Sequence, residues 1–273
     1  MASPPAITFT VNLEDPTGRY APGERYIAMT RRVLDICDEA GCKATFFAVG
    51  RVADSAPDLI RDIAAYGHEI AYYGRSRVPL TKEEPERFRR ESRADKEKLE
   101  QLAGRDVAGF RAPHFSLTPQ SLWALDVLNE LGFRYSSSVM PTDMTPFGFA
   151  DAPRAPFTWP NGMIEFPMPV AALGKYHLPY LGGLYFYLLP DFVVRGFIKK
   201  AMADEILWAH AHPYDFDREK KFAAAPGTPF WIRAALGLAR KKAAGKIRRF
   251  LLNSFAPPLR ERLPDSPPFF LPY

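Results

Sequence analysis

The chain has few of the residues on which disulfide-rich or zinc-bound small proteins depend. Its 273 residues include only two cysteines, Cys37 and Cys42, which form neither a disulfide framework nor a zinc-finger spacing. We therefore predict two reduced cysteines in the core. No apolar run reaches the roughly 20 residues that a membrane span needs, and no basic and apolar leader precedes the strand predicted to begin at Ala6. These absences lead us to expect a cytoplasmic protein without a signal peptide.

The composition suits a large folded core. Hydrophobic residues make up 47% of the chain, which is enough for one large α/β domain or two small ones. The 27 prolines concentrate between Pro141 and Pro190 and after Ala225, so these parts should be rich in loops. The net charge of +5 indicates a solvated basic face, with an acidic partner or a membrane surface as the alternative. We expect no nucleic acid partner.

Strand and helix patterns alternate through the first half of the chain. Strands are predicted at 6–11, 44–50, 67–73, 108–110 and 133–135, and helices at 24–40, 56–66, 83–102 and 118–131. This alternation is typical of parallel strands joined by crossover helices. The second half is less regular, with strands predicted at 163–167 and 206–210 and a helix at 192–202. The heavily charged helix at 83–102 should lie on the outside.

A basic helical pattern occupies residues 228–254, within a stretch that has no acidic residue between Glu219 and Glu261. An apolar stripe could be formed by Trp231, Ile232, Leu236, Ile247, Phe250 and Leu251. We expect either a terminal helix docked on the preceding fold or an interfacial helix that touches anionic lipid. Gly237 and Gly245 weaken the case for one continuous helix. The predicted division is a main domain at 1–220 and a helical, proline-rich extension at 221–273.

Five short segments carry polar residues at the ends of predicted strands. They are 11–15, 67–77, 111–116, 135–138 and 210–213. In this order they resemble the motifs of the polysaccharide deacetylase family, also known as the NodB-homology or carbohydrate esterase 4-like family. The resemblance covers about residues 6–216. It implies an α/β fold, a distorted (β/α) barrel of the TIM-like type, with its site at the carboxyl ends of the strands.

The resemblance also implies a chemistry that this chain departs from. In the family, a carboxylate and two histidines hold zinc or a similar ion, and an aspartate deprotonates the attacking water. Asn12 stands where that aspartate is expected, and Glu14 stands at the metal carboxylate, with Asp15 as a second candidate. Tyr73 and Arg77 replace the two metal histidines. Because phenol is a rare zinc ligand and guanidinium cannot bind a metal, we predict no bound metal or other cofactor.

Other motif residues are retained. The resemblance places Arg111 in the third motif, the backbone N–H of His114 at the oxyanion position, and His212 at the general acid. Ser136 stands where an acid is usual. His68 matches a position that is not a ligand, and we interpret it as structural. His177 has no assignable role.

Two functions follow as hypotheses. The first is a hydrolase of the C–N bond of an acylated amino sugar or related amide that works without tightly bound metal. It would use Glu14 or Asp15 as base, His212 as acid, and Arg77 with the His114 N–H as stabilisers.

The second hypothesis is a catalytically inactive pseudoenzyme that acts as a carbohydrate-binding or regulatory protein. Its candidate sugar platform consists of Tyr72, Tyr73, Phe115, Tyr180, Tyr185 and Tyr214, which in the simpler interpretation are core and rim packing. In both, Arg77 should pair with Glu14 or Asp15, because these carboxylates would otherwise lack a counter-charge.

Overall fold

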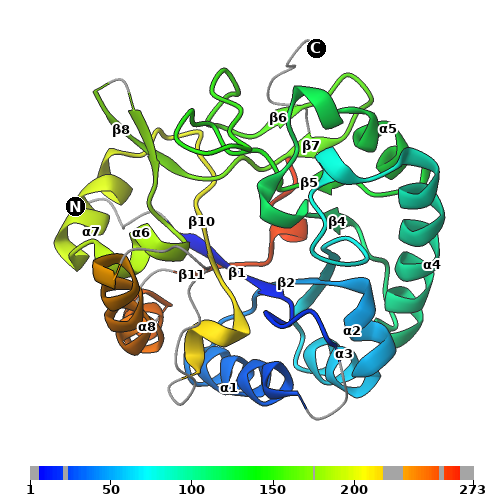
Figure 1. The fold of residues 1–273 in the computed structure, drawn as a ribbon, viewed down its shortest axis with the longest axis horizontal. Helices are drawn as coiled ribbons and strands as arrows, with labels where there is room; N and C mark the ends of the chain where they lie inside the picture. The colour runs from blue at the N-terminus through cyan, green and yellow to red at the C-terminus, as the bar shows by residue number, and fades with distance from the viewer. Residues whose placement is uncertain (1–5, 21–23, 175, 218–229, 252–254, 265–273) are drawn as a thin grey trace.

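A computed structural model describes residues 6–20, 24–174, 176–217, 230–251 and 255–264. Its centre is a nine-stranded sheet in the order β10-β1-β2-β3-β4-β5-β7-β6, with β11 beside β1. The strands are β1 (Ile7–Leu13), β2 (Thr45–Ala48), β3 (Glu69–Tyr72), β4 (Gly109–Phe110), β5 (Tyr135–Ser136), β6 (Phe157–Thr158), β7 (Ile164–Glu165), β10 (Trp208–Ala211) and β11 (Phe255–Ala256). Figure 1 looks along the interior around which this sheet curls. This curled, half-barrel sheet confirms the distorted, TIM-like barrel that the family resemblance implies.

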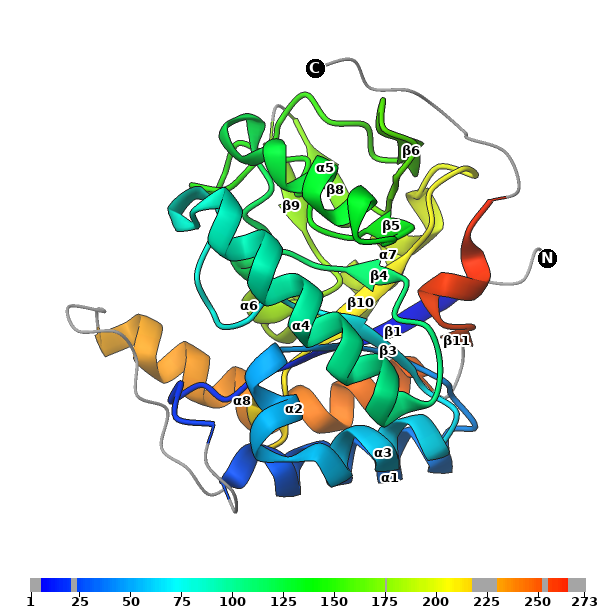
Figure 2. The same ribbon diagram turned by 90° about the vertical axis from the view of Figure 1, so that its right-hand side faces the viewer.

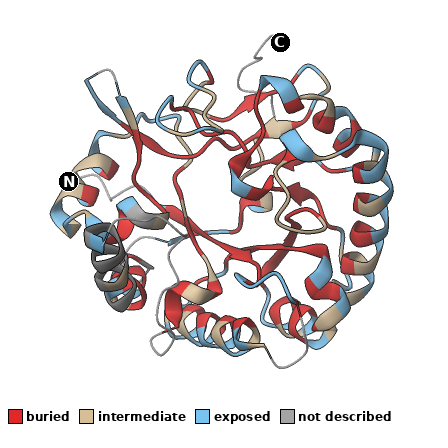
Figure 3. Ribbon diagram, viewed as in Figure 1, coloured by how far each residue is buried: buried red, intermediate tan, exposed pale blue. Residues whose placement is uncertain are grey.

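Helices cover the outside of the curl. They are α1 (Arg25–Glu39), α2 (Gly50–Ser55), α3 (Pro57–Ala65), α4 (Pro85–Ala103), α5 (Trp123–Glu130), α6 (Gly183–Leu188), α7 (Asp191–Lys200) and α8 (Phe230–Leu251). Short 3-10 turns occur at η1 (Leu80–Lys82), η2 (Pro113–Phe115), η3 (Pro119–Ser121), η4 (Pro213–Phe216) and η5 (Leu259–Arg262). Figure 3 shows the strands buried and the outer sides of the helices exposed. No helix of the described segments is long and apolar enough to cross a membrane.

The first half of the chain follows its predicted order. The pairs β1–β2, β2–β3, β3–β4 and β4–β5 are all parallel, and a helix or helix pair connects each strand to the next. The 3-10 turn η1 precedes α4, and η2 and η3 precede α5. Parallel pairing brings the carboxyl ends of all these strands to one side of the sheet. The polar segments that follow those ends are therefore brought together.

Helix α4 is on the outside, as expected, but it is less purely polar than its sequence suggests. Glu84 caps its N-terminus by accepting from two backbone N–H groups, and Gly104 ends it with a φ of 66°, which glycine adopts without a steric penalty. Phe88 and Leu99 are buried against the sheet. The buried Asp95 accepts a hydrogen bond from the Tyr72 hydroxyl at 3.0 Å and pairs with Arg75 at 2.7 Å.

The second half contains elements that sequence patterns did not indicate. The predicted strands at 163–167 and 206–210 shorten and shift to β7 and β10, and the helix at 192–202 becomes α7. Strand β6, helix α6 and a separate hairpin of β8 (Val170–Leu173) and β9 (Tyr176–Pro179) were not predicted. Gly182 then pairs with His210 beside β10. Two-residue strands such as β6 carry too little periodicity to be recognised in a sequence.

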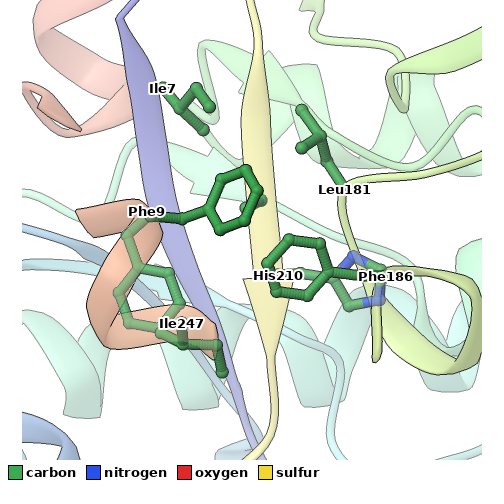
Figure 4. Close-up of a pocket in the computed structure, with 8 residues that line it drawn as sticks. Ile7, Phe9, Leu181, Phe186, His210 and Ile247 are labelled. Atoms are coloured by element: carbon green, nitrogen blue, oxygen red, sulfur yellow. The ribbon is translucent and has the colours of Figure 1, made fainter. Parts of the chain in front are cut away.

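Helix α8 is a single helix, contrary to the expectation that its two glycines interrupt it. Its second half docks on the sheet and α6 through Ala243, Ala244, Ile247 and Phe250, all buried. The side chains of Trp231, Ile232, Leu236 and Leu251 lie outside the described part. A cavity of about 20 Å³ remains under this helix, between β1, β10 and α6 (Figure 4). It is lined by apolar side chains and by His210, whose pKa burial lowers well below its usual range. His210 is thus a core histidine.

The segment from β11 to η5 closes the other end of the sheet, where the strands begin. The backbone N–H of Leu259 donates to the Thr45 hydroxyl at 2.9 Å, and that of Arg260 donates to Oε2 of Glu69 at 3.2 Å. The Tyr135 hydroxyl donates to Oε1 of the same buried carboxylate at 2.8 Å. Figure 2 shows this segment on the side where β1 begins. Residues up to 262 therefore complete the main sheet.

Candidate functional site

Glu14 and Arg77 form an ion pair at the carboxyl ends of β1 and β3. Nε of Arg77 lies 2.9 Å from Oε2 of Glu14, whose side chain is only 3% exposed. Burial alone would lower the pKa of Arg77, but the carboxylate of Glu14 together with the neighbouring phenols Tyr214, Tyr73 and Tyr20 outweighs this effect, so the pKa of the guanidinium is raised. The Arg77 side chain remains 33% exposed. The predicted pairing is confirmed, with Glu14 as the partner.

Asp15 has a different role from its neighbour. Its carboxylate accepts from the backbone N–H groups of Thr17, Arg19 and Tyr20 at 2.9 to 3.1 Å, and from the Thr17 hydroxyl at 2.5 Å. Burial raises the pKa of Asp15, but these hydrogen bonds prevail and the net pKa is lowered. Asp15 therefore fixes the turn after β1. Its role as a base beside Glu14 stays a prediction.

Arg111 crosses the interior beneath this pair and is wholly buried. Its guanidinium lies 3.9 Å from the ring centre of Phe47 and 4.2 Å from that of Trp208. Nη1 donates to Oδ1 of Asn12 at 2.9 Å, and Nη2 donates to the Ser137 hydroxyl at 2.9 Å. Within the described segments no carboxylate forms an ion pair with it, and burial lowers the pKa of Arg111 to about 9. Asn12 thus supplies an amide where a carboxylate would neutralise the charge.

His212 lies between Asn12, Glu14 and a residue that the sequence analysis missed. Its Nε2 lies 3.3 Å from Nδ2 of Asn12 and 3.7 Å from Oε1 of Glu14. Its Nδ1 lies 3.4 Å from Oδ2 of Asp215, and its backbone N–H donates to the same oxygen at 2.8 Å. Because the Asn12 amide can only donate from Nδ2, this arrangement puts the imidazole proton on Nδ1, toward Asp215. The ring stacks on Tyr214 at 4.6 Å.

Asp215 is buried and held by two partners besides the histidine ring. The Tyr187 hydroxyl donates to it at 2.7 Å. The available signal in the sequence was its position three residues after His212, across Pro213. This spacing makes His212 the N-cap of the 3-10 turn η4 and places Asp215 within that turn. Tyr187 lies in α6, which the sequence did not predict, so its part in the site could not be read from the chain.

Tyr73 and His114 close the remaining side of the site. Burial and the charge of Glu14 raise the pKa of the Tyr73 phenol, and a hydrogen bond from the backbone N–H of His114 opposes that rise. His114 and Phe115 both have left-handed backbones, with φ of 58° and 56°, a strained state for such residues. The His114 imidazole is exposed, and its Nε2 lies 3.2 Å from the backbone oxygen of Arg77. The predicted oxyanion donor therefore serves the Tyr73 hydroxyl.

The fourth of the five motif segments, residues 135–138, lies beside an acidic residue from another part of the chain. Glu165, at the end of β7, accepts from the backbone N–H groups of Ser138 and Val139 at 2.6 and 3.0 Å. Burial raises its pKa. Ser136 and Ser138 are joined by a hydrogen bond of 2.8 Å between their hydroxyls. This cluster organises the loop after β5, and sequence analysis did not select Glu165 because its segment showed no motif.

The donors at this site do not fit a divalent metal. The described residues contain no group of three or more histidine, cysteine, aspartate or glutamate side chains that could hold an ion. Glu14 and His212 are ligand types, but Asp215 is already held by the Tyr187 hydroxyl and the His212 N–H, and Arg77 places a fixed cation against Glu14 at 2.9 Å. A second cation there would meet like-charge repulsion.

Most of the predicted aromatic platform is core. Tyr72, Tyr73, Phe115 and Tyr180 are buried, so the simpler interpretation holds for them. Tyr185 is exposed on α6, and Tyr214 is half-buried beside His212. The accessible side chains around the site are Arg77, His114, Phe147, His212 and Tyr214; we call these five the rim.

A curled, mostly parallel α/β sheet with polar groups at the carboxyl ends of its strands defines the class of fold used by carbohydrate-directed deacetylases. Residues 23–136 match the family described as polysaccharide deacetylase, so this part of the chain carries a domain of that family. Residues 137–256 match a domain of unknown function, DUF3473. The two family matches meet at residues 136 and 137, and the second one continues across residue 220. The predicted division at residue 220 remains a prediction.

Named relatives share the first part of the chain. A peptidoglycan-N-acetylglucosamine deacetylase of Bacillus cereus is 30% identical over 101 residues, covering 37% of each chain. A chitooligosaccharide deacetylase of Azorhizobium caulinodans is 32% identical over 118 residues, covering 42% of this chain and 55% of that protein. The chain thus spans about half the length, or less, of these relatives. A crystal structure of a putative polysaccharide deacetylase from Mycobacterium smegmatis has a TM-score of 0.61 at 20% identity, covering 96% of this chain and 92% of that one. It supports the fold.

Proposed function

We propose that this polysaccharide deacetylase-family protein binds N-acylated amino sugars at the rim without the metal-dependent hydrolysis that its fold usually carries. The observation that carries the proposal is the Arg77–Glu14 ion pair, 2.9 Å long, at the position where the resemblance places a metal. A guanidinium there neutralises the carboxylate and can donate hydrogen bonds, but it cannot coordinate a water or a carbonyl oxygen as a metal ion would.

Other groups support the same conclusion. The Asn12 amide cannot take up a proton near neutral pH. The His114 N–H, which would stabilise an oxyanion, donates to the Tyr73 hydroxyl. Each polar group of the usual mechanism is therefore either replaced or engaged within the protein. A closed network of this kind preserves the shape of a site more readily than its reactivity.

The rim suits a sugar. His114 stacks with Phe147 at 6.3 Å and His212 with Tyr214 at 4.6 Å, so ring faces border the exposed guanidinium of Arg77. Ring faces pack against the C–H side of a pyranose, while Arg77 and the imidazoles can bond its hydroxyl and acetamido oxygens. The sugar class comes from the relatives, whose names specify peptidoglycan N-acetylglucosamine and chitooligosaccharides.

The test is a calorimetric titration with N-acetylglucosamine oligomers, together with an assay for released acetate. We expect saturable binding and no acetate release. His114→Ala should weaken binding at least fivefold, whereas Arg61→Ala, in an exposed pair with Asp58 on α3, should leave it unchanged. Absence of binding to any acylated amino sugar contradicts the proposal.

A metal-independent hydrolase is the second candidate, and the His212 contacts favour it. Nε2 lies 3.7 Å from Glu14, and Asp215 orients the ring, so a base and an acid face each other. In this reaction Glu14 takes a proton from water, and the water oxygen attacks the acyl carbon. His212 must first gain a second proton, on Nε2, which replaces its contact with Asn12. The C–N bond breaks as His212 delivers that proton to the amine, and the proton held by Glu14 then restores the protonated His212. The Arg77–Glu14 pair must open first. Acetate release in the presence of a chelator, abolished by Glu14→Gln and by His212→Gln, would establish this candidate in place of the first.

A further inference from the structure

Helices α6 and α7 expose large apolar side chains on the flank of the barrel that also carries α8 (Figure 1). Phe192 is 76% exposed, and Leu188 and Tyr185 are 46% and 37% exposed. On α7 the opposite face is buried through Val194 and Ile198. The exposed positions are therefore the outward side of a helix that is already docked.

The same outward side of α7 is basic. Phe192, Arg195 and Lys199 follow one another at helical spacing and are all exposed, and Lys200 extends the stripe. The guanidinium carbon of Arg195 lies 4.9 Å from the ring centre of Phe250 on α8. The basic stripe of α7 is therefore next to that helix. We call Tyr185, Leu188, Phe192, Arg195, Lys199 and Lys200 the α6–α7 face.

Acidic groups do not offset this charge. The one acid of α7, Asp191, lies 3.4 Å from Nζ of Lys246 and 3.1 Å from Nε of Arg249, both on α8. Asp204, beyond the end of α7, is exposed, and Glu205 pairs with Arg154 at 2.7 Å. Helix α8 contributes no acid in its 22 residues. Its exposed Arg248 pairs with Glu39 at 2.8 Å, while Lys242 adds another exposed cation.

We propose that the α6–α7 face binds the surface of an anionic bilayer. Exposed aromatic and aliphatic side chains beside a row of lysine and arginine are the pattern by which interfacial helices insert at the headgroup level. The sequence suggested α8 for this role. Ile247 and Phe250, however, are turned inward against the barrel, so α8 anchors the face and α7 presents it.

The experiment is co-sedimentation of the full chain with vesicles of phosphatidylcholine alone or mixed with phosphatidylglycerol. We expect binding to the mixed vesicles that is at least tenfold tighter than to the neutral ones and is lost in high salt. Phe192→Ser and the double variant Lys199→Glu, Lys200→Glu should each reduce it at least fivefold. Tyr66→Ser and Arg61→Glu, exposed on the α3 side, are the matched controls and should bind as the wild type does.

Three results would overturn the proposal. They are equal binding to both vesicle types, equal losses in the face and control variants, and self-association of the chain that disappears in Phe192→Ser. Thermal unfolding of each variant shows whether it is folded. Sugar binding at the rim is measured separately without vesicles, so failure here leaves the proposed function standing, and the reverse also holds.

Discussion

Nε of Arg77 and Oε2 of Glu14 lie 2.9 Å apart, and the carboxylate is almost completely withdrawn from water. The arginine is partly open to solvent, so the pair is asymmetric. Loss of the ion pair therefore affects the buried Glu14 more than the partly exposed Arg77. This asymmetry determines how variants of the two residues should differ.

Arg77→Ala should destabilise the protein by about 2 kcal/mol, because it leaves a buried carboxylate without its cation. Glu14→Gln in that background should recover part of the loss, since it removes the stranded charge. Urea unfolding of the wild type, both single variants and the double variant measures the coupling. Arg61→Ala serves as an exposed ion-pair control and should cost no more than about 0.5 kcal/mol. Additive losses would show that the pair contributes nothing to stability.

Asn12→Asp, Tyr73→His and Arg77→His combined should create a zinc site. The two imidazoles would join Glu14 as ligands, and the new aspartate would face Arg111, which now lacks a carboxylate partner in the described segments. We expect about one equivalent of zinc after loading and desalting, with acetate release from N-acetylglucosamine oligomers. The wild type, treated alike, should retain none. Zinc retained by the wild type and removed by His212→Ala would instead reveal a rebuilt metal site.

His68 should make the protein sensitive to acid. It is buried, accepts a hydrogen bond on Nδ1 from the Ala44 N–H at 3.0 Å, and its pKa is lowered to about 4 by burial and then by the charge of Lys43. The unfolded chain binds a proton near pH 6.5 and the folded chain only near pH 4. Stability therefore falls as the pH drops through this window, by about 3 kcal/mol at most. His68→Gln should flatten that part of the stability curve, and His177→Gln should not. Identical curves for His68→Gln and wild type would contradict this role.

Gly182→Ala and Gly196→Ala should change stability in opposite directions. A Cβ on Gly182 would lie 1.9 Å from Nδ1 of His210, so the core must move, at a cost of about 1 to 3 kcal/mol. Nothing lies within 4 Å of a Cβ on Gly196, and alanine there should stabilise α7 by up to about 1 kcal/mol. Thermal unfolding of both variants tests this. A neutral Gly182→Ala would mean that His210 is free to move aside.

Short sequence patterns predicted those parts of the fold that depend on neighbouring residues. Strands β1 and β2 are recognisable because dense runs of apolar and β-branched residues suit burial on both faces. The Arg77–Glu14 pair could be anticipated because Arg77 stands at a metal-histidine position of the family and Glu14 at the metal-carboxylate position. The two charges were therefore expected to lie side by side. Asp215 could not be anticipated, since its partner Tyr187 lies in a helix of six residues with no sequence signal. The same holds for Glu165, whose hydrogen-bond donors, the backbone N–H groups of Ser138 and Val139, come from a separate loop earlier in the chain. The burial of four predicted platform aromatics reflects tertiary packing, which residue type alone does not specify.

The closure of the sheet by residues 255–262 has a consequence for synthesis on the ribosome. Glu69 and Thr45 are translated early, but two of their hydrogen-bond donors, the N–H groups of Arg260 and Leu259, are translated 191 and 214 residues later. Until then the Glu69 carboxylate and the Thr45 hydroxyl of a nascent chain lack these donors, and strand β1 lacks its neighbour β11. Such long-range completion slows folding and lengthens the exposure of a sheet edge to other chains. Truncation before Phe255 should therefore yield a protein that aggregates during expression while its polar site residues are all present.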